Sequence, residues 1–353
     1  MKPKTSFQRK GAKGKPEGRR ALEIQRPKLP GKKPFSAFLR PLCASALKNR
    51  GVTGFSMMRP GRLALLAAAF ALSGSALAEL SLKDDTGQEI RLKAPARRIV
   101  ALAPHIAESL FAAGAGDKLV GTVDYSDYPP EAKKVPRVGG YSRVDLEAVA
   151  ALKPDLVLAW ESGNNMPQIS KLRALGLSVY VSQPNKMENV ADQLERLGQL
   201  AGSEAVARPA AERFRQRLEA LRKANAGKLK VRTFYQIWKT PLMTVGGPQI
   251  ISDAITLCGG ENVFGHLGKM APTVSVEAVL EADPEAIVAT GMGDAKPEWL
   301  KDWDKWTQMT AVKRNNLFHI NPDIMQRHTP RILDGAEKLC AHLDVARSHR
   351  PAR

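Results

Sequence analysis

The sequence predicts an α/β protein of two pseudo-symmetric, Rossmann-like lobes with parallel sheets, joined by one long rigid helix, with a ligand cleft between the lobes. First, strand-like and helical segments alternate on both sides of residues 203–227, a pattern typical of parallel sheets covered by helices. Second, residues 203–225 read as an unbroken Ala-, Glu-, Arg- and Leu-rich helix, a rod on the order of 30 Å long. Third, one segment occurs twice.

That repeated segment covers residues 144–159 and 274–289, which match at a constant offset of 130. Each copy reads as a short helix with Asp145 or Ser275 as its N-cap, then a break marked by proline, then a buried strand. The repeat therefore predicts two lobes that are copies of one unit.

The same pattern divides the chain from residue 79 onward into four parts. They are an N-terminal hairpin (79–96), an N-terminal ligand-binding lobe (97–202), a linker helix (203–227) and a C-terminal ligand-binding lobe (228–348). Roughly 275 residues are enough for two domains of ordinary size.

The charge of the chain is concentrated before residue 79. Residues 1–78 hold 17 Lys and Arg against two acids, so they carry 17 − 2 = +15 of the formal +19. The remainder holds 54 − 17 = 37 basic and 35 − 2 = 33 acidic side chains, a balance of +4. Because charge implies a nucleic-acid partner only where it is concentrated in the folded part, we expect no such partner.

Residues 57–78 read as a secretory signal peptide. A basic start precedes an apolar run of about ten residues, well short of the roughly 20 of a spanning helix, and Ala76-Leu77-Ala78 fits a cleavage site. We expect cleavage near Ala78 and a soluble periplasmic protein without a lipid anchor, because the residue directly after the cleavage point is Glu79 and not a Cys. For residues 1–56 two interpretations stay open: a start assigned upstream of the true one at Met57 or Met58, or a disordered basic tail.

Two cysteines, Cys258 and Cys340, follow the expected cleavage point. In an oxidising compartment such a pair predicts one disulfide, and two separately buried thiols are the alternative. The chain contains no G-x-S-x-G, H-E-x-x-H or P-loop motif, and its His, Cys and acidic residues show no close metal-site spacing. We therefore expect neither an enzyme, nor a catalytic cofactor, nor a resident metal.

Four segments in order resemble the periplasmic cobalamin-binding proteins of the BtuF type: residues 125–130, 145–160, 258–264 and 323–331. The resemblance covers about residues 97–345. The wider group is the helix-linked, class III substrate-binding proteins of ABC importers, which carry cobalamin, haem or ferric siderophores. It implies a monomer that takes part in vitamin B12 and hence cobalt transport, delivering a corrinoid to a permease dimer in the inner membrane.

The resemblance also implies roles for individual residues. Tyr125 matches an aromatic corrin contact, Tyr141 a Trp platform, and Trp160 a strand-end Trp; Asp323 and Arg327 match polar contacts to ligand side groups. Glu147 and Glu277 match the two acids that bind Arg residues of the permease, and Cys258 and Cys340 match a disulfide. The sequence departs from the family at Met243, which replaces a Phe, and at Ala271, which replaces a Trp that closes over the ligand.

Several of these residues also have simpler interpretations. Glu147 and Glu277 suit the first turn of any helix, and Asp323 and Arg327 are spaced for a local ion pair. Trp160 would equally support the cleft wall. His105, at a helix start, would either ligate cobalt or iron, face the cleft, or touch solvent or the ligand edge. The alternative ligands are haem and a ferric siderophore. The alternative of another class is an envelope enzyme that uses the cleft.

Overall fold

The structure is a computed structural model that describes residues 79–291 and 297–351. The predicted extension (1–56) and signal peptide (57–78), including the cleavage site near Ala78, lie outside the described residues. None of the helices in the described ranges combines the length and the apolarity that a bilayer crossing requires.

The first half of the described chain contains a four-stranded parallel sheet with the order β4-β3-β5-β6. Central β3 places Ile99 opposite Leu119 of β4 and Leu156 of β5. Strands β3 and β6 are fully buried, and β4 and β5 each have one half-buried residue, as the apolar runs in the sequence predict. The strands are β3 (Ile99–Ala101), β4 (Leu119–Thr122), β5 (Leu156–Trp160) and β6 (Val179–Ser182). The helices are α2 (Pro104–Ala112), α3 (Leu146–Ala151), α4 (Met166–Ala174) and α5 (Met187–Ala201), with 3₁₀ turns at Gly116–Lys118 and Pro130–Lys134.

The predicted N-terminal hairpin is present as β1 (Leu80–Lys83) and β2 (Glu89–Leu92), which pair antiparallel. Asp84 in its turn accepts hydrogen bonds from the backbone N–H groups of Thr86, Gln88 and Val181. The last of these bonds ties the hairpin to β6.

The second half contains a sheet with the order β11-β10-β7-β8, and β9 also pairs with β7. The pairs of β7 with β9 and β10, and of β10 with β11, are parallel, whereas the edge strand β8 is antiparallel. The strands are β7 (Val231–Trp238), β8 (Met243–Thr244), β9 (Gly260–Asn262), β10 (Ala286–Ala289) and β11 (Leu317–His319). The helices are α7 (Ile250–Leu257), α8 (Val276–Ala282), α9 (Thr310–Lys313), α10 (Pro322–Met325) and α11 (Ile332–Ser348), with a 3₁₀ helix at Glu298–Trp303.

The two repeats have the predicted local structure. The Asp145 side chain accepts a hydrogen bond from the Ala148 N–H at 3.0 Å, and Ser275 Oγ accepts one from the Ala278 N–H at 3.1 Å. Each cap starts a short helix, α3 or α8, that leads into an interior strand, β5 or β10. The α/β prediction with parallel sheets is confirmed, with β8 as an unpredicted antiparallel edge.

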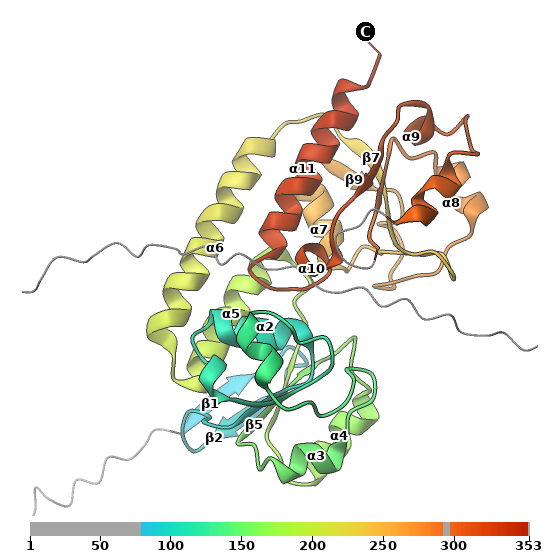
Figure 1. The fold of residues 1–353 in the computed structure, drawn as a ribbon. Coiled ribbons are helices and arrows are strands. Elements are labelled where there is room, and N and C mark those ends of the chain that lie inside the picture. Colours follow the sequence, from blue (N-terminus) through green and yellow to red (C-terminus); the bar gives the residue numbers. More distant parts are fainter. Residues whose placement is uncertain (1–78, 292–296, 352–353) are drawn as a thin grey trace, which may run out of the picture. The chain divides into compact units, whose positions relative to one another are not determined.

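The long helix between the two sheets is α6 (Glu204–Asn225, 22 residues). Arg215 pairs with Asp192 and Glu195 of α5 at 2.9 and 2.7 Å. Arg217 pairs with Asp334 and Glu337 of α11 at 2.7 and 2.8 Å, where α6 and α11 run alongside each other (Figure 1). Ion pairs thus hold this helix to an element of each half.

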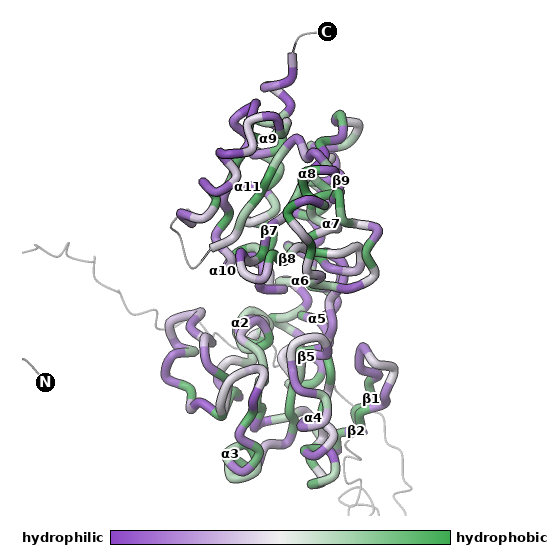
Figure 2. The backbone as a smooth tube through the Cα atoms, turned by 90° about the vertical axis from the view of Figure 1, so that its right-hand side faces the viewer, coloured by the Kyte–Doolittle hydropathy of each residue, from purple (hydrophilic) through white to green (hydrophobic). Residues whose placement is uncertain are grey.

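The apolar face of α6 also takes part in the core. Ala211, Phe214 and Leu218 belong to one buried cluster that includes Leu194 of α5 and Leu339 of α11. Two further clusters line the other face of each sheet. In Figure 2 the green, hydrophobic stretches accordingly gather around β5 in one half and β7 in the other. The core is therefore continuous from the first sheet to the second through α6.

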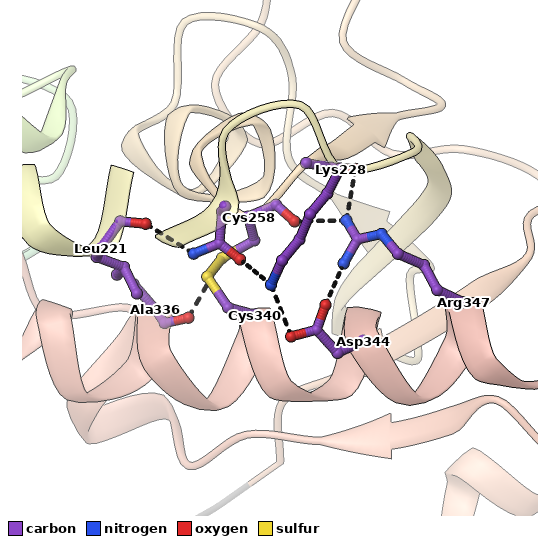
Figure 3. The surroundings of a disulfide bond; sticks show 9 residues. Leu221, Lys228, Cys258, Ala336, Cys340, Asp344 and Arg347 are labelled. Carbon is purple, nitrogen blue, oxygen red and sulfur yellow. Dashed lines mark hydrogen bonds and ion pairs between the residues drawn. A yellow bond between two sulfur atoms is a disulfide. The ribbon is translucent and has the colours of Figure 1, made fainter. Parts of the chain in front are cut away.

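The predicted disulfide between Cys258 and Cys340 is present and joins the end of α7 to α11. Charged groups surround it (Figure 3): the Lys228 ammonium donates to Asp344 at 2.8 Å, and Arg347 donates to the carbonyl of Cys258 at 2.7 Å. Both sulfur-bearing residues are buried, so the bond crosslinks the interior of the second lobe.

Candidate functional site

The predicted ligand residues follow the carboxyl ends of parallel strands, where ligands of open α/β sheets bind. His105 is the second residue of α2, the helix that follows β3, and Trp160 is the last residue of β5. In the second lobe, Asp323 lies in α10, just after β11. Side chains from the two lobes contact one another at these strand ends.

Two predicted aromatic residues are exposed at the strand ends of the first lobe. Tyr125, just past β4, is 70% exposed and has a backbone φ of +64°. That left-handed conformation costs a non-glycine residue about 1 kcal/mol or more. Tyr141 is 42% exposed in a tight turn closed by the pairing of Gly139 with Val144. Exposed aromatic faces and a strained backbone are both typical of ligand-binding sites.

Behind Tyr141 lies a cluster of rings that we call the imidazole cluster: Trp160, His105 and His328. The ring centroids of His105 and Trp160 are 5.0 Å apart, and those of Trp160 and His328 are 5.9 Å apart. The two imidazoles come from different lobes, and their centroids are 5.3 Å apart. Tyr141 contacts the cluster through Trp160, at 6.3 Å. The structure therefore brings together Tyr141, Trp160 and His105, three of the residues that the sequence analysis assigned to the ligand site.

His328 is a member of this cluster that the sequence analysis missed. It directly follows Arg327, inside a segment already expected at the ligand. A lone histidine in a loop carries no pattern of its own, and only the packing of the two lobes places it opposite His105. The one feature of the sequence that could have indicated a role for His328 is its position after the last predicted strand.

Asn164 is a second residue that the sequence analysis missed, and it positions the first-lobe part of the site. Its side-chain oxygen accepts a hydrogen bond from the backbone N–H of Trp160 at 2.6 Å. Its amide group donates to the carbonyls of Leu102 and Tyr141 at 2.8 and 2.6 Å. One buried amide thus fixes the ends of β3 and β5 and the turn that carries Tyr141.

Burial keeps both histidines of the imidazole cluster neutral. It lowers the pKa of His328 to about 4. Burial, together with the nearby His328 and Arg327, lowers the pKa of His105 well below its usual value. A neutral imidazole has one nitrogen free to accept a hydrogen bond or bind a metal.

Acidification should therefore destabilise the protein before its carboxylates titrate. Unfolded histidine takes up a proton near pH 6.5, whereas folded His328 does so only near pH 4. The stability contributed by neutral His328 is thus complete above pH 6.5 and falls by up to roughly 3 kcal/mol as the pH drops to 4. Thermal unfolding at pH 7.0, 5.5 and 4.5 would measure this loss.

The matched variants for that measurement are His328→Asn, which removes the titrating group, and His266→Ala, which removes an exposed histidine of the same lobe. We expect a flatter pH profile for His328→Asn and an unchanged one for His266→Ala. Equal pH profiles for His328→Asn and the wild type would contradict the prediction.

Ion pairs cross between the lobes beside the imidazole cluster. Arg331 forms a two-pronged pair with buried Glu108 of α2, at 2.7 and 2.6 Å, and its guanidinium lies 3.6 Å from the Tyr128 ring centroid. Arg327 pairs with Asp127 of the first lobe at 2.7 Å and with Asp323 at 2.9 Å. The local Asp323–Arg327 pair is therefore present, and Arg327 also bridges the two lobes.

Met243, the remaining predicted ligand residue, lies in β8 beside Trp238, which is 44% exposed. Met243 is half-buried and also pairs with Thr273. Met270, the loop residue directly before Ala271, contacts the first lobe. Its sulfur accepts a hydrogen bond from Gln183 Nε2 at 3.5 Å. The segment before exposed Ala271 thus contacts both lobes without an aromatic side chain.

One large cavity does not coincide with these residues. It measures about 910 Å³ and lies between the start of α5, the end of α6 and the α7–β9 region. Its lining includes Lys186, Arg222, Asp253 and Glu261 and none of the predicted ligand residues. We place the candidate site at the strand ends, where the exposed aromatic and paired charged groups gather, rather than in this cavity.

The predicted docking acids, Glu147 and Glu277, are both exposed in the first turn of their helices, α3 and α8. Hydrogen bonds from the backbone and from Ser275 lower the pKa of Glu277. Glu147 borders a hollow of about 420 Å³ that Arg143 and Gln168 also line. Both carboxylates are thus available at the surface in equivalent positions of the repeat.

Comparison with known proteins relates these features to a family. A family described as periplasmic binding protein matches residues 99–324. The vitamin B12-binding protein of Vibrio cholerae serotype O1 is 38% identical, over 71% of this chain and 91% of that protein. Among solved structures, the periplasmic vitamin B12 binding protein BtuF of Vibrio cholerae has a TM-score of 0.67 and 37% identity, covering 72% of this chain and 98% of the other.

A periplasmic heme binding protein from Pseudomonas aeruginosa has the same fold, with a TM-score of 0.61 and 25% identity over 73% of this chain and 95% of the other. The region that the family matches includes all strands of both parallel sheets.

Proposed function

This chain belongs to the periplasmic binding protein family, and on that premise we propose that it carries cobalamin or a related corrinoid to an ABC importer. In this proposal a signal peptide ending near Ala78 exports the protein. Residues 97–202 and 228–348 form the two ligand-binding lobes, residues 203–227 link them, and the protein acts as a monomer. The observation that carries the proposal is the set of exposed aromatic and paired charged side chains at the strand ends of both lobes.

A corrin is a flat, largely apolar ring with amide arms, so it is best held by aromatic faces and by hydrogen-bonding groups at its edge. Tyr125 and Tyr141 offer both a face and a hydroxyl, and Trp160 lies behind them. Asp323 and Arg327 supply polar groups from the second lobe. We also assign His105 and Met243 to the ligand site, and the similarity to vitamin B12-binding proteins supports the corrinoid.

The test is a binding panel with the purified protein: cyanocobalamin, cobinamide, haemin and ferric siderophores, followed by calorimetry and absorption spectra. Tight corrinoid binding that weakens at least tenfold in Tyr125→Ala would support the proposal. A Soret band with haemin and no corrinoid binding would replace it with haem carriage, and siderophore binding alone would replace it with iron carriage.

We further propose that Glu147 and Glu277 dock the protein onto an importer permease dimer. They are exposed, they occupy equivalent positions in the repeat, and each lies on a different lobe. Two separated negative charges on a pseudo-symmetric protein suit a two-fold partner with two basic patches.

Reversing both charges, Glu147→Lys with Glu277→Lys, should abolish uptake of the bound ligand into vesicles containing the importer, while ligand affinity stays within twofold. Like charges placed at an interface repel by several kcal/mol. The matched control is Asp117→Lys with Asp304→Lys, which makes the same charge change at exposed acids elsewhere on each lobe. Normal uptake by the Glu147/Glu277 variant would rule out the docking role.

A further inference from the structure

Several buried polar atoms near the imidazole cluster have no hydrogen-bond partner in the protein. They are His105 Nε2, Ser109 Oγ, Trp160 Nε1, His328 Nδ1 and Thr329 Oγ1. The two histidines are only 4% and 2% exposed. A buried polar group without a partner destabilises the protein, and such groups gathered in one place point to a ligand that completes their hydrogen bonds.

The arrangement of the two histidines narrows the kind of ligand. His105 comes from α2 of the first lobe, and His328 follows α10 of the second, so one imidazole faces the other across the boundary between the lobes. Trp160 packs edge-on against both rings and limits their rotation. Burial keeps both imidazoles neutral, which is the form that binds metals.

The number of side chains available to coordinate a metal also narrows the kind of ligand. In the two stretches that the structure describes, no group of three or more His, Cys, Asp or Glu side chains is placed to hold a metal ion. A free ion such as Zn²⁺ takes about four ligands, so two imidazoles make a poor site for it. The metal of a flat macrocycle already has four ligands in the ring plane and lacks only the two axial ones.

We infer that His105 and His328 bind the metal of a flat macrocycle carried between the lobes, one imidazole on each face. The inference rests on the proposed function and deepens it. It selects cargo whose axial positions exchange readily, such as an aquated corrinoid or haem, over cargo whose axial positions are blocked. The unpartnered indole N–H of Trp160 is then a donor for an acceptor at the edge of the macrocycle.

The lobes must part for such a ligand to enter. Metal–imidazole bonds are about 2 Å long, so the centroid separation of 5.3 Å has to increase. The contacts that resist this are the pair of Arg331 with Glu108 and that of Arg327 with Asp127. Ligand entry therefore exchanges interlobe ion pairs for contacts to the ligand.

The experiment is an absorption titration of the wild-type protein with diaquacobinamide and with dicyanocobinamide. We expect the visible bands of bound diaquacobinamide to shift as imidazole replaces water on both faces. We expect dicyanocobinamide to bind at least tenfold more weakly and without a shift. His105→Ala and His328→Ala should each lose part of the shift and bind diaquacobinamide at least tenfold more weakly, while His266→Ala should behave like the wild type.

His105→Phe and His328→Phe keep a ring of similar size without its nitrogens, and circular dichroism checks the fold of every variant. Corrinoid binding without a shift in the wild type, or a shift that depends on only one histidine, would overturn the inference and leave the proposed function standing. If only haemin binds and each variant loses its bis-imidazole spectrum, the corrinoid cargo is wrong and the histidine pair stands. If no metal macrocycle binds, both are wrong.

Discussion

Replacing Cys258 and Cys340 together by serine should lower the free energy of unfolding by about 4 kcal/mol, the chain-entropy value for a crosslink of this span. The disulfide joins two cysteines that are 82 residues apart in the sequence. Its loss therefore frees a long loop in the unfolded state. Chemical denaturation of the oxidised wild type and of the variant would measure the difference.

The control is the wild type denatured in the presence of a reductant, which should show the same loss without any change of sequence. A serine variant as stable as the oxidised wild type would show that packing around α7 and α11, rather than the crosslink, holds this part of the fold. The Lys228–Asp344–Arg347 network beside the bond (Figure 3) is the packing that would then be responsible.

Glu108→Ala should lower the free energy of unfolding by about 3 kcal/mol or more, because removal of one partner leaves the other charge buried and unpaired. The Glu108 side chain is 3% exposed and that of Arg331 is 22% exposed, so water replaces the lost partner only in part. Urea denaturation monitored by tryptophan fluorescence would report the change.

Two variants show whether the buried charge is the cause. Glu108→Leu combined with Arg331→Met removes both charges and should recover most of the lost stability. Glu337→Ala breaks one arm of the exposed pair with Arg217, whose side chains are 46% and 42% exposed, and should cost less than about 1 kcal/mol. Equal losses for Glu108→Ala and Glu337→Ala would contradict the prediction.

The features that the sequence predicted well have local causes. The caps Asp145 and Ser275 follow from side-chain geometry within one turn, and the buried strands follow from short apolar runs. Cys258 and Cys340 could be paired because only two cysteines follow the expected cleavage point. Tyr141 and Trp160 were expected at the ligand because of the resemblance to the BtuF-type proteins, and the structure places them beside His105.

Most features that the sequence did not predict depend on residues far apart in the chain. Helix α5 was not predicted, although the linker helix was placed from residue 203, and Gly202, in the left-handed conformation, ends α5. His328 contacts His105 of the other lobe, and one of the partners of Asn164, Leu102, is 62 residues away. The pair of Glu108 with Arg331 spans 223 residues. A helical acid and a loop arginine carry no signal that selects one partner among many.

The core that continues through α6 has consequences for the evolution of the protein and for the effect of cleaving its linker. The repeat indicates that an ancestral unit was duplicated, yet Phe214 and Leu218 now pack between apolar residues of both copies. Neither copy alone would keep its share of this interior covered. The duplicated halves have thus become one folding unit, and a cut within the linker would yield two insoluble fragments rather than two small domains.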